Sequence, residues 1–378
     1  MSSAVAETST SAGRADGPVN LLDLDRQALK RLFADLGEKP FRATQVLKWV
    51  HQRRVTGFEE MTDISKALRA RLAERVALRL PEVLAEQVSE DGTRKWLLRV
   101  DGGQAIETVF IPDSGRGTLC VSSQVGCALD CSFCSTAQQG FNRNLSTAEI
   151  IGQYYVAYDQ LTGTGEQITN VVFMGMGEPL LNLEAVIPAV RLMTDDDAYG
   201  LSKRKVTIST SGVVTMLERM REQTDVSLAV SLHAPNNALR DELVPINRKH
   251  PLERLIPACA AYIADKPHRR ITWEYVMLDG VNDQDHHAHE LARLLGDIPS
   301  KVNLIPFNPF PGARYRCSPR GRILRFVRIL QSHGLTATTR VTRGQDIDGA
   351  CGQLVGKVQD RTRRQQRLVQ RELRREGR

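Results

Sequence analysis

Three cysteines within eight residues, Cys127, Cys131 and Cys134, are the feature of this sequence with the most chemical content. Thiolates are the usual protein ligands of iron–sulfur clusters. A CxxxCxxC run in a loop can bind three irons of a [4Fe–4S] cluster and leave the fourth iron without a protein ligand. That iron can then bind a substrate or cofactor, as the open position of a catalytic zinc site does. Chance rarely produces this spacing in a chain with only seven cysteines.

Two other uses of these thiols have to be weighed. A structural zinc site normally takes four ligands, and Cys120 could be the fourth, but no second CxxC pair or nearby histidine supports it. A disulfide framework is less favoured, because the cysteines are odd in number and clustered and no secretory signal precedes them. An iron–sulfur cluster is therefore the first interpretation and zinc the second.

The spacing of the triplet resembles the signature of the radical S-adenosylmethionine (SAM) enzymes. The resemblance implies one [4Fe–4S] cluster whose free iron chelates the amino and carboxylate groups of SAM. It also implies that one electron from the cluster cleaves SAM to a 5′-deoxyadenosyl radical. Because such clusters persist where thiols stay reduced, we expect a cytoplasmic protein. We expect no membrane partner, since no run approaches the roughly 20 apolar residues of a membrane span.

Alternating strand and helix patterns from about residue 115 to 345 must position the triplet. The runs that predict strands are short and mostly apolar, at 118–122, 170–174, 205–209, 226–232, 271–278, 302–306 and 337–341. Segments such as Thr147–Leu161 and Leu183–Met193 have helical periodicity. The alternation predicts an α/β fold with a parallel sheet and with chemistry at the carboxyl ends of its strands. Periodicity does not separate a partial barrel from an open doubly wound sheet.

The first part of the chain predicts a small helical unit. Three helices are expected, over 24–36, from Pro40 onward and over 64–80. Gly37 would stop the first helix, and Thr62 or Asp63 would cap the third. Residues 21–80 carry thirteen Lys or Arg against eight Asp or Glu. An RNA-docking surface and a structural appendage with ordinary surface arginines both fit this composition.

A hairpin and a basic tail complete the organisation. Strands at 95–100 and 105–111, joined by an Asp-Gly-Gly turn, predict a hairpin between the helical unit and the sheet. The tail has nine Lys or Arg against three Asp or Glu over 357–378, which suits phosphate contacts or a solvated, frayed helix. Five units are predicted along the chain. They are a disordered tail (1–20), a helical accessory domain (21–85), a hairpin connector (86–112), an α/β domain (113–345), and a C-terminal loop with the basic tail (346–378).

Seven motifs in order resemble those of the radical-SAM RNA adenine methyltransferases of the RlmN type. They are Glu107–Pro112, Thr118–Cys127, Met174–Leu180, Ser209–Gly212, Ser231–His233, Asn303–Asn308 and Ala350–Gly352. The resemblance extends from about residue 21 to about residue 355. It implies a partial (βα)6 radical-SAM barrel with a small N-terminal helical domain and a C-terminal catalytic loop. The resemblance therefore favours the partial barrel over the open doubly wound sheet.

The resemblance also implies a set of SAM contacts near the ends of predicted strands. These residues are Gly177, Glu178, Ser209, Ser231, Leu232, His233 and Asn308. Taken singly, the two serines would be turn residues and the histidine a structural one. The loop from Gly175 to Pro179 lacks the third glycine of a dinucleotide-binding loop. Only the agreement of these motifs with the family's motifs, in the same order along the chain, favours a role in SAM binding.

Two further cysteines and one glutamate receive catalytic roles only through the resemblance. Alone, Cys120 would be a buried strand thiol and Cys351 an incidental loop thiol. The resemblance implies that Cys351 becomes S-methylated and that Cys120 resolves the adduct through a transient disulfide. Glu107, an ordinary strand glutamate by composition, is implied to be the base that takes the proton from the reacting adenine carbon.

The implied reaction methylates C2 of adenosine in the peptidyl-transferase region of 23S rRNA and 3′ to the anticodon of tRNA, with two SAM molecules per turnover. The implied partners include a flavodoxin- or ferredoxin-like electron donor and a thiol reductant, and we expect a monomer. Two alternatives stay open. One is a C8-specific adenine methyltransferase of the same family, and the other is a zinc-stabilised RNA-binding protein without catalysis.

Overall fold

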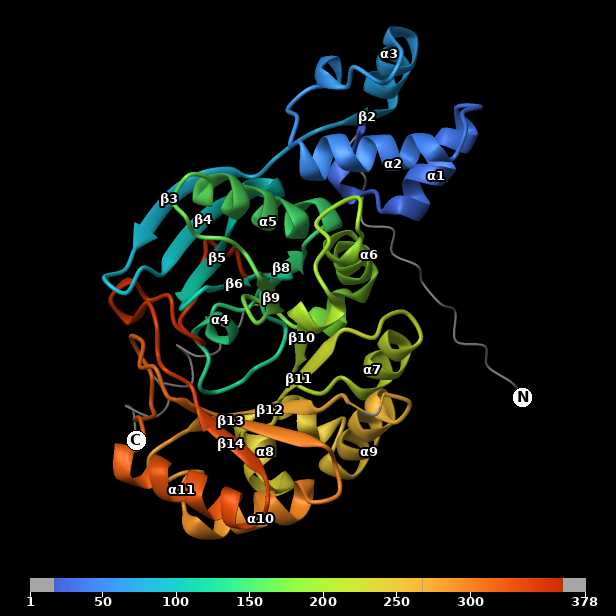
Figure 1. The fold of residues 1–378 in the computed structure, drawn as a ribbon. Helices are drawn as coiled ribbons and strands as arrows, with labels where there is room; N and C mark the ends of the chain where they lie inside the picture. Colours follow the sequence, from blue (N-terminus) through green and yellow to red (C-terminus); the bar gives the residue numbers. More distant parts are fainter. Residues whose placement is uncertain (1–16, 267, 363–378) are drawn as a thin grey trace, which may run out of the picture.

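A ten-stranded mixed sheet is the centre of the computed structural model, which describes residues 17–266 and 268–362. The strand order is β14-β13-β12-β11-β10-β9-β6-β5-β4-β3, so β14 and β3 form its two edges and the sheet does not close on itself (Figure 1). The predicted disordered tail, apart from residues 17–20, lies outside the described residues, and so does the basic tail beyond residue 362.

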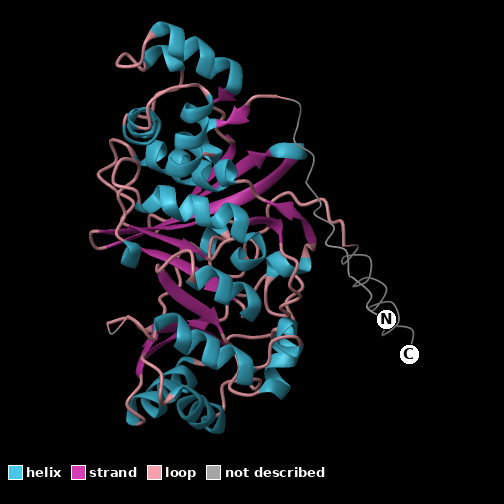
Figure 2. Ribbon diagram, turned by 90° about the vertical axis from the view of Figure 1, so that its right-hand side faces the viewer, coloured by secondary structure: helices cyan, strands magenta, loops and turns pink. Residues whose placement is uncertain are grey.

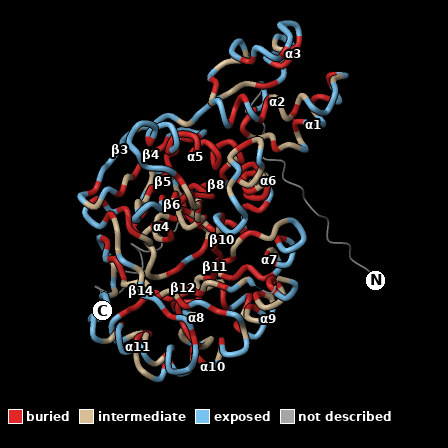
Figure 3. The backbone as a smooth tube through the Cα atoms, in the orientation of Figure 1, coloured by how far each residue is buried: buried red, intermediate tan, exposed pale blue. Residues whose placement is uncertain are grey.

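Seven of the ten strands are parallel and confirm the seven runs expected from the sequence. They are β6 (Arg116–Cys120), β9 (Asn170–Phe173), β10 (Val206–Thr210), β11 (Ser227–Ser231), β12 (Ile271–Met277), β13 (Ser300–Pro306) and β14 (Thr336–Thr339). Their β-branched residues suit a pleated sheet that is covered by helices. Figure 3 shows the buried chain concentrated along these strands and the helix faces against them.

Helices between the strands produce the six strand–helix units of a partial barrel. These helices are α5 (Thr147–Leu161), α6 (Leu183–Thr194), α7 (Val214–Arg221), α8 (Asn237–Leu243), α9 (Leu252–Ile263), α10 (Asp285–Leu295) and α11 (Arg320–Ser332). The pair α8 and α9 follows one strand, and β14 is added after the sixth unit. Figure 1 shows the helices along the outer side of the curved sheet. None of the helices among the described residues is long and apolar enough to span a bilayer.

The expected hairpin is part of the main sheet. Strand β4 (Arg94–Val100) and strand β5 (Gln104–Asp113) pair antiparallel, and Gly102 in their turn has φ +75°, which glycine adopts without a steric cost. Strand β5 also pairs antiparallel with β6, and β3 (Glu82–Val88) pairs with β4. The expected domain boundary between residues 85 and 86 therefore falls inside β3.

The N-terminal unit is helical as expected, with shorter elements. Helix α1 (Arg26–Asp35) ends before Gly37, which has φ +69°, and α2 (Phe41–Leu47) continues into a π-helical turn. Helix α3 (Lys66–Arg75) begins after Ser65, whose hydroxyl accepts a hydrogen bond from the backbone N–H of Leu68. The expected caps Thr62 and Asp63 are wrong by two or three positions. Strand β2 (Val76–Ala77) replaces the rest of the expected third helix and pairs with β1 (Val19–Asn20).

The helical unit is attached to the barrel by polar contacts with α5 and with the loop after α6. Arg26 forms ion pairs with Asp195 and Asp197. The buried His51 ring lies 3.1 Å from the Tyr199 hydroxyl, measured from Nδ1, and the ring of Tyr199 also packs on Tyr154 of α5. Figure 2, viewed from the side, shows this unit at one end of the α/β body.

The segment after β14 returns along the inner side of the sheet. Gly344 donates its backbone N–H to Asp91 in the β3–β4 turn at 2.9 Å, and Lys357 forms an antiparallel bridge with Ala105 of β5. Further along, the Thr136 hydroxyl donates to the carbonyl of Leu354 at 2.7 Å. The segment that carries Cys351 is therefore held between the hairpin and the loop of the cysteine triplet.

Candidate active site

The cysteine triplet lies in a loop between two short strands. Strand β7 (Gln124–Gly126) precedes it and pairs antiparallel with β8 (Phe141–Asn144), while α4 (Ser135–Gln138) begins directly after Cys134. Gly126 has φ +76°, and a Cβ there would lie 2.1 Å from the carbonyl oxygen of Gly140. Only glycine allows the two strands to approach this closely ahead of the first cysteine.

The three thiols line one cavity with the ends of several barrel strands. Its empty volume is about 960 Å³, including the open mouth, within the range of small-molecule sites. Burial is the main cause that raises the pKa of Cys131 to about 12, and it raises the pKa of Cys127 and Cys134 as well. The thiols are therefore protonated in the metal-free chain, and metal binding has to release these protons.

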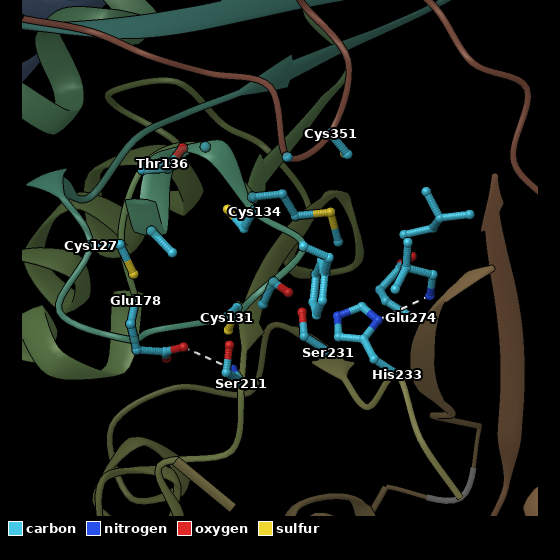
Figure 4. A pocket seen from close by; sticks show the side chains of 18 of the residues that line it. Cys127, Cys131, Cys134, Thr136, Glu178, Ser211, Ser231, His233, Glu274 and Cys351 are labelled. Carbon is cyan, nitrogen blue, oxygen red and sulfur yellow. Dashed lines mark hydrogen bonds between the residues drawn. The ribbon is translucent and has the colours of Figure 1, made fainter. Parts of the chain in front are cut away.

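The loop after β9 places a buried carboxylate in this cavity. Glu178 accepts hydrogen bonds from the backbone N–H groups of Leu180 at 3.1 Å and Ser211 at 2.8 Å (Figure 4). Burial nevertheless raises the pKa of Glu178, against the lowering by these donors. The preceding Gly177 has φ +100°, and a Cβ there would lie 2.5 Å from Cβ of Gln124. Gly177 thus has a steric reason to be glycine besides any ligand contact.

The strand ends bring together most of the residues expected to bind a cofactor. Ser209, Ser231, His233 and Asn308 all line the cavity of the triplet, together with Gly177 and Glu178. Leu232 does not line it: its side chain is fully buried in the main core. Its carbonyl accepts a hydrogen bond from Arg240 at 3.1 Å.

His233 is held as a neutral imidazole. Its Nδ1 accepts the backbone N–H of Val276 at 3.0 Å, which leaves the ring proton on Nε2 (Figure 4). Burial, with a smaller contribution from Arg240, lowers the pKa of His233 to about 3. The Phe133 ring packs edge-on against it at 4.6 Å between centroids. This histidine can therefore donate from Nε2 while it carries no charge.

A second cavity lies beside the first and contains the remaining two cysteines expected to be catalytic. Cys120 and Cys351 both line it, and Cys351 also lines the cavity of the triplet. Burial raises the pKa of Cys120 to about 12, and the nearby Cys351 adds to this. The amide of Asn308 donates to the Cys351 carbonyl at 3.3 Å. Cys120 therefore lies with Cys351 and not with the triplet, which removes it as a fourth ligand for zinc.

Arg340 and Glu274 are site residues that the sequence reasoning missed. Both line the cavity of the triplet, and Arg340 lines the second cavity as well. The negative charge available at Cys351, followed by that of Glu274, raises the pKa of Arg340. The only sequence signal was that Arg340 lies near the end of the run 337–341 that predicted the last strand, whereas in the structure β14 ends at Thr339.

Glu107 lies outside the residues that line these two cavities. Its carboxylate pairs with the Lys95 ammonium at 3.1 Å and accepts the backbone N–H of Val355 at 2.8 Å. Lys95 in turn donates to the carbonyl of Asp348 at 3.3 Å. The pair therefore holds both flanks of the segment that carries Cys351.

The donor set fits a cluster bound through three thiolates. Cys127, Cys131 and Cys134 share one cavity with the polar side chains of Glu178 and Ser209, which suit the amino group and other polar groups of SAM. Within residues 17–266 and 268–362, no three His, Cys, Asp or Glu side chains lie close enough to hold a single metal ion.

Comparisons with known proteins show which family this chain resembles. A family model described as the ribosomal RNA large subunit methyltransferase N-terminal domain matches residues 19–78, and the radical SAM superfamily model matches residues 121–292. The dual-specificity RNA methyltransferase RlmN of Halorhodospira halophila is 64% identical over 92% of this chain and 97% of its own length. The protein of the same name from a Marinomonas species is 56% identical over 93% and 97%.

A solved structure supports the same assignment. The crystal structure of a radical SAM methyltransferase from Sphaerobacter thermophilus is 44% identical, has a TM-score of 0.83, and covers 89% of this chain and 99% of its own. The chain belongs to the RlmN family of radical-SAM methyltransferases.

Proposed function

We propose that this protein methylates C2 of adenosine in the peptidyl-transferase region of 23S rRNA and 3′ to the anticodon of tRNA. The observation that carries the proposal is the position of Cys351, which borders both the cavity of the triplet and the cavity of Cys120. A methyl carrier has to reach a radical source on one side and a resolving thiol on the other. Membership of a family named for dual-specificity RNA methylation supports the substrate class.

The chemistry explains why a carrier is needed. C2 of adenine is an unactivated amidine carbon and a poor partner for direct transfer of an electrophilic methyl group. When bound, one [4Fe–4S] cluster and two SAM molecules supply an electron, a methyl group and a 5′-deoxyadenosyl radical. The triplet holds the cluster, and Gly177, Glu178, Ser209, Ser231, His233 and Asn308 form the SAM site. Leu232 takes part only through its place between Ser231 and His233. Cys351 accepts the methyl group on Sγ and presents its carbon to adenine.

Release of the product uses the other two residues. Glu107 takes the C2 proton, and the one electron that the radical adduct has to lose would return to the bound cluster. Cys120 attacks the Sγ of Cys351, the Sγ–carbon bond breaks, the carbon takes up a proton to become the methyl group on C2, and a Cys120–Cys351 disulfide remains. A thiol reductant resets the pair by exchange. Because the Glu107 carboxylate is bonded to Lys95 and to the N–H of Val355, the segment around Cys351 has to move before Glu107 reaches the substrate.

The partners follow from the same chemistry. The RNA substrate has to present an unstacked adenine, and exposed arginines of the helical unit, such as Arg53 and Arg75, supply phosphate contacts. A flavodoxin- or ferredoxin-like protein supplies the electron. The enzyme works as a monomer in the cytoplasm, where a thiol reductant is available.

A single reaction tests the proposal. Anaerobically reconstituted protein is incubated with a reductant, SAM labelled in its methyl group, and either a 23S rRNA fragment or a tRNA, and the RNA is digested to nucleosides. Mass spectrometry should find 2-methyladenosine, and the protein should contain iron in place of zinc.

The same reaction separates the alternatives. The Cys351→Ala variant serves as the control and should leave the RNA unmethylated while it retains iron. Appearance of 8-methyladenosine would show the C8 activity instead. Zinc in place of iron, together with unmodified RNA, would refute catalysis.

A further inference from the structure

Arg240 is a fully buried cation behind the strand ends that border the cavity of the triplet. It lies on α8, and its guanidinium forms no ion pair within 4.0 Å among the residues that the structure describes. A buried charge is costly unless an opposite charge and hydrogen bonds compensate it. Burial accordingly lowers the pKa of Arg240 to about 10. The fold therefore retains a cation whose counter-charge is not a neighbouring carboxylate.

The guanidinium forms hydrogen bonds with residues at the ends of two barrel strands. Its Nε donates to the carbonyl of Leu232 at 3.1 Å, and Nη2 donates to the carbonyls of Ser211 at 2.7 Å and Ser231 at 3.1 Å. Nη1 donates to the side-chain oxygen of Asn247 at 2.8 Å. All four acceptors are neutral oxygens. Three of them belong to the turns after β10 and β11, which carry residues of the candidate SAM site.

Ser211 connects this arrangement to the cysteine triplet. Its backbone N–H donates to the Glu178 carboxylate at 2.8 Å, and Ser211 lines the cavity of the triplet together with Cys131. Figure 4 shows Ser211 between Glu178 and Cys131. A shift of the Arg240 guanidinium would therefore move the N–H donor to Glu178 and one wall of the cavity of the triplet together.

The charge of Arg240 lies directly behind the cavity of the triplet. Two residues whose carbonyls accept hydrogen bonds from its guanidinium, Ser211 and Ser231, also line that cavity. The carboxylate of the adjacent Asp241 accepts a hydrogen bond from the amide of Asn247 at 2.6 Å. Reduction of an iron–sulfur cluster adds one negative charge, and nearby charge and hydrogen bonds set its potential. A buried cation behind the cavity that holds the cluster stabilises the reduced state more than the oxidised state.

We infer that Arg240 is a positioning residue for the cluster and SAM, and that it is the buried counter-charge of the cluster. The inference rests on the proposed function only in requiring a cluster at the triplet. Two substitutions distinguish the positioning role from the counter-charge role. Lysine keeps the positive charge but loses the planar guanidinium, whereas glutamine loses the charge.

The experiment compares the reconstituted wild type with Arg240→Lys and Arg240→Gln. The cluster midpoint potential is measured by titration monitored with electron paramagnetic resonance, and SAM affinity by equilibrium binding. The potential should fall in Arg240→Gln and stay near the wild-type value in Arg240→Lys. Both variants should bind SAM about tenfold more weakly, as expected for misplaced hydrogen bonds to a charged ligand. Arg26→Gln, which breaks the ion pairs between the helical unit and the loop after α6, is the control and should change neither.

Each part can fail separately. A wild-type potential in Arg240→Gln would overturn the counter-charge role, and wild-type SAM affinity in both variants would overturn the positioning role. If Arg240→Gln does not fold, Arg240→Lys decides alone: a lowered potential overturns the counter-charge role, and wild-type SAM affinity the positioning role. A wild type that binds a cluster but leaves RNA unmethylated would refute the proposed function and not this inference.

Discussion

The two thiols assigned to methyl transfer have different surroundings at the residue scale. Cys120 is buried at the end of β6, and desolvation raises its pKa to about 12. Cys351 is partly exposed, lines two cavities, and lies beside Arg340. A carrier that is approached from two sides and a resolving thiol that is kept protonated suit the order of steps proposed for them.

The variants Cys351→Ala and Cys120→Ala should therefore fail at different steps. Without Cys351 no carrier exists, and no covalent adduct with RNA should form. Without Cys120 the methyl transfer and radical addition proceed, but the adduct is not resolved. Protein joined to RNA through Cys351 should then accumulate as a band of low mobility that ribonuclease collapses. Both variants should retain iron, and normal turnover by either one would contradict the two-cysteine mechanism.

Buried neutral histidines predict a dependence of stability on pH. Burial lowers the pKa of His51, as of His233, to about 3. Each ring stays neutral in the folded chain while the unfolded chain takes up a proton below about pH 6.5. The two histidines therefore do not reduce the free energy of unfolding above that pH. As the pH falls from about 6.5 toward 3, each of them lowers the free energy of unfolding by about 1.4 kcal/mol per pH unit.

Urea unfolding at pH 8, 6 and 5 tests this prediction. The difference between the wild type and His51→Gln removes the contribution of other groups, such as the buried Glu178 with its raised pKa. The free energy of unfolding should fall less steeply in the variant, so the difference should shrink as the pH falls. A difference that is constant across this range would mean that His51 titrates alike in both states.

At the scale of elements, an ion pair between two strands controls the segment of Cys351. Lys95 of β4 and Glu107 of β5 lie opposite the flanks of this segment and bind the Asp348 carbonyl and the Val355 N–H. A buried pair of this kind costs several kcal/mol when one partner is removed, because the other charge stays uncompensated.

Lys95→Met should therefore destabilise the protein by about 3–5 kcal/mol and should speed amide hydrogen exchange over residues 348–355. The double variant Lys95→Met with Glu107→Gln removes both charges and should recover much of the stability. It should not recover methylation, since Glu107 is the proposed base. Exchange rates equal to those of the wild type in Lys95→Met would show that the pair does not hold the segment.

The sequence predicted elements wherever burial is continuous. The seven barrel strands and helices α5 and α6 agree within a few residues, because apolar runs and helical periodicity report burial directly. Strand β3 was missed because most of its residues are exposed and only pairing with β4 holds it. Lys95 and Arg240 were missed for another reason: they act on backbone carbonyls, and the carbonyl bound by Lys95 lies 253 residues away. Only resemblance suggested Glu107 and Cys351, since local pattern carries no sign of their roles.

At the scale of the whole molecule, the helical unit and the barrel present separate surfaces to a large RNA. The unit contacts the barrel through α5 and the loop after α6, which involves Arg26 and Arg54. Arg53 and Arg75 stay exposed, and Arg53 stacks on the Trp49 ring at 4.0 Å. These two arginines are available to phosphates without disturbing the contact with the barrel.

The double variant Arg53→Glu with Arg75→Glu should weaken RNA binding and leave SAM cleavage unchanged. Each phosphate contact that is lost should reduce the slope of log affinity against log salt by about 0.7–0.9. Arg328→Glu, which reverses an exposed arginine on α11, is the matched control and should keep the wild-type slope. Binding is measured by fluorescence anisotropy with a tRNA anticodon stem-loop from about 50 to 200 mM salt. Because RNA docking is electrostatic in this proposal, an unchanged slope in the double variant would make the helical unit a structural appendage and would move the contact elsewhere.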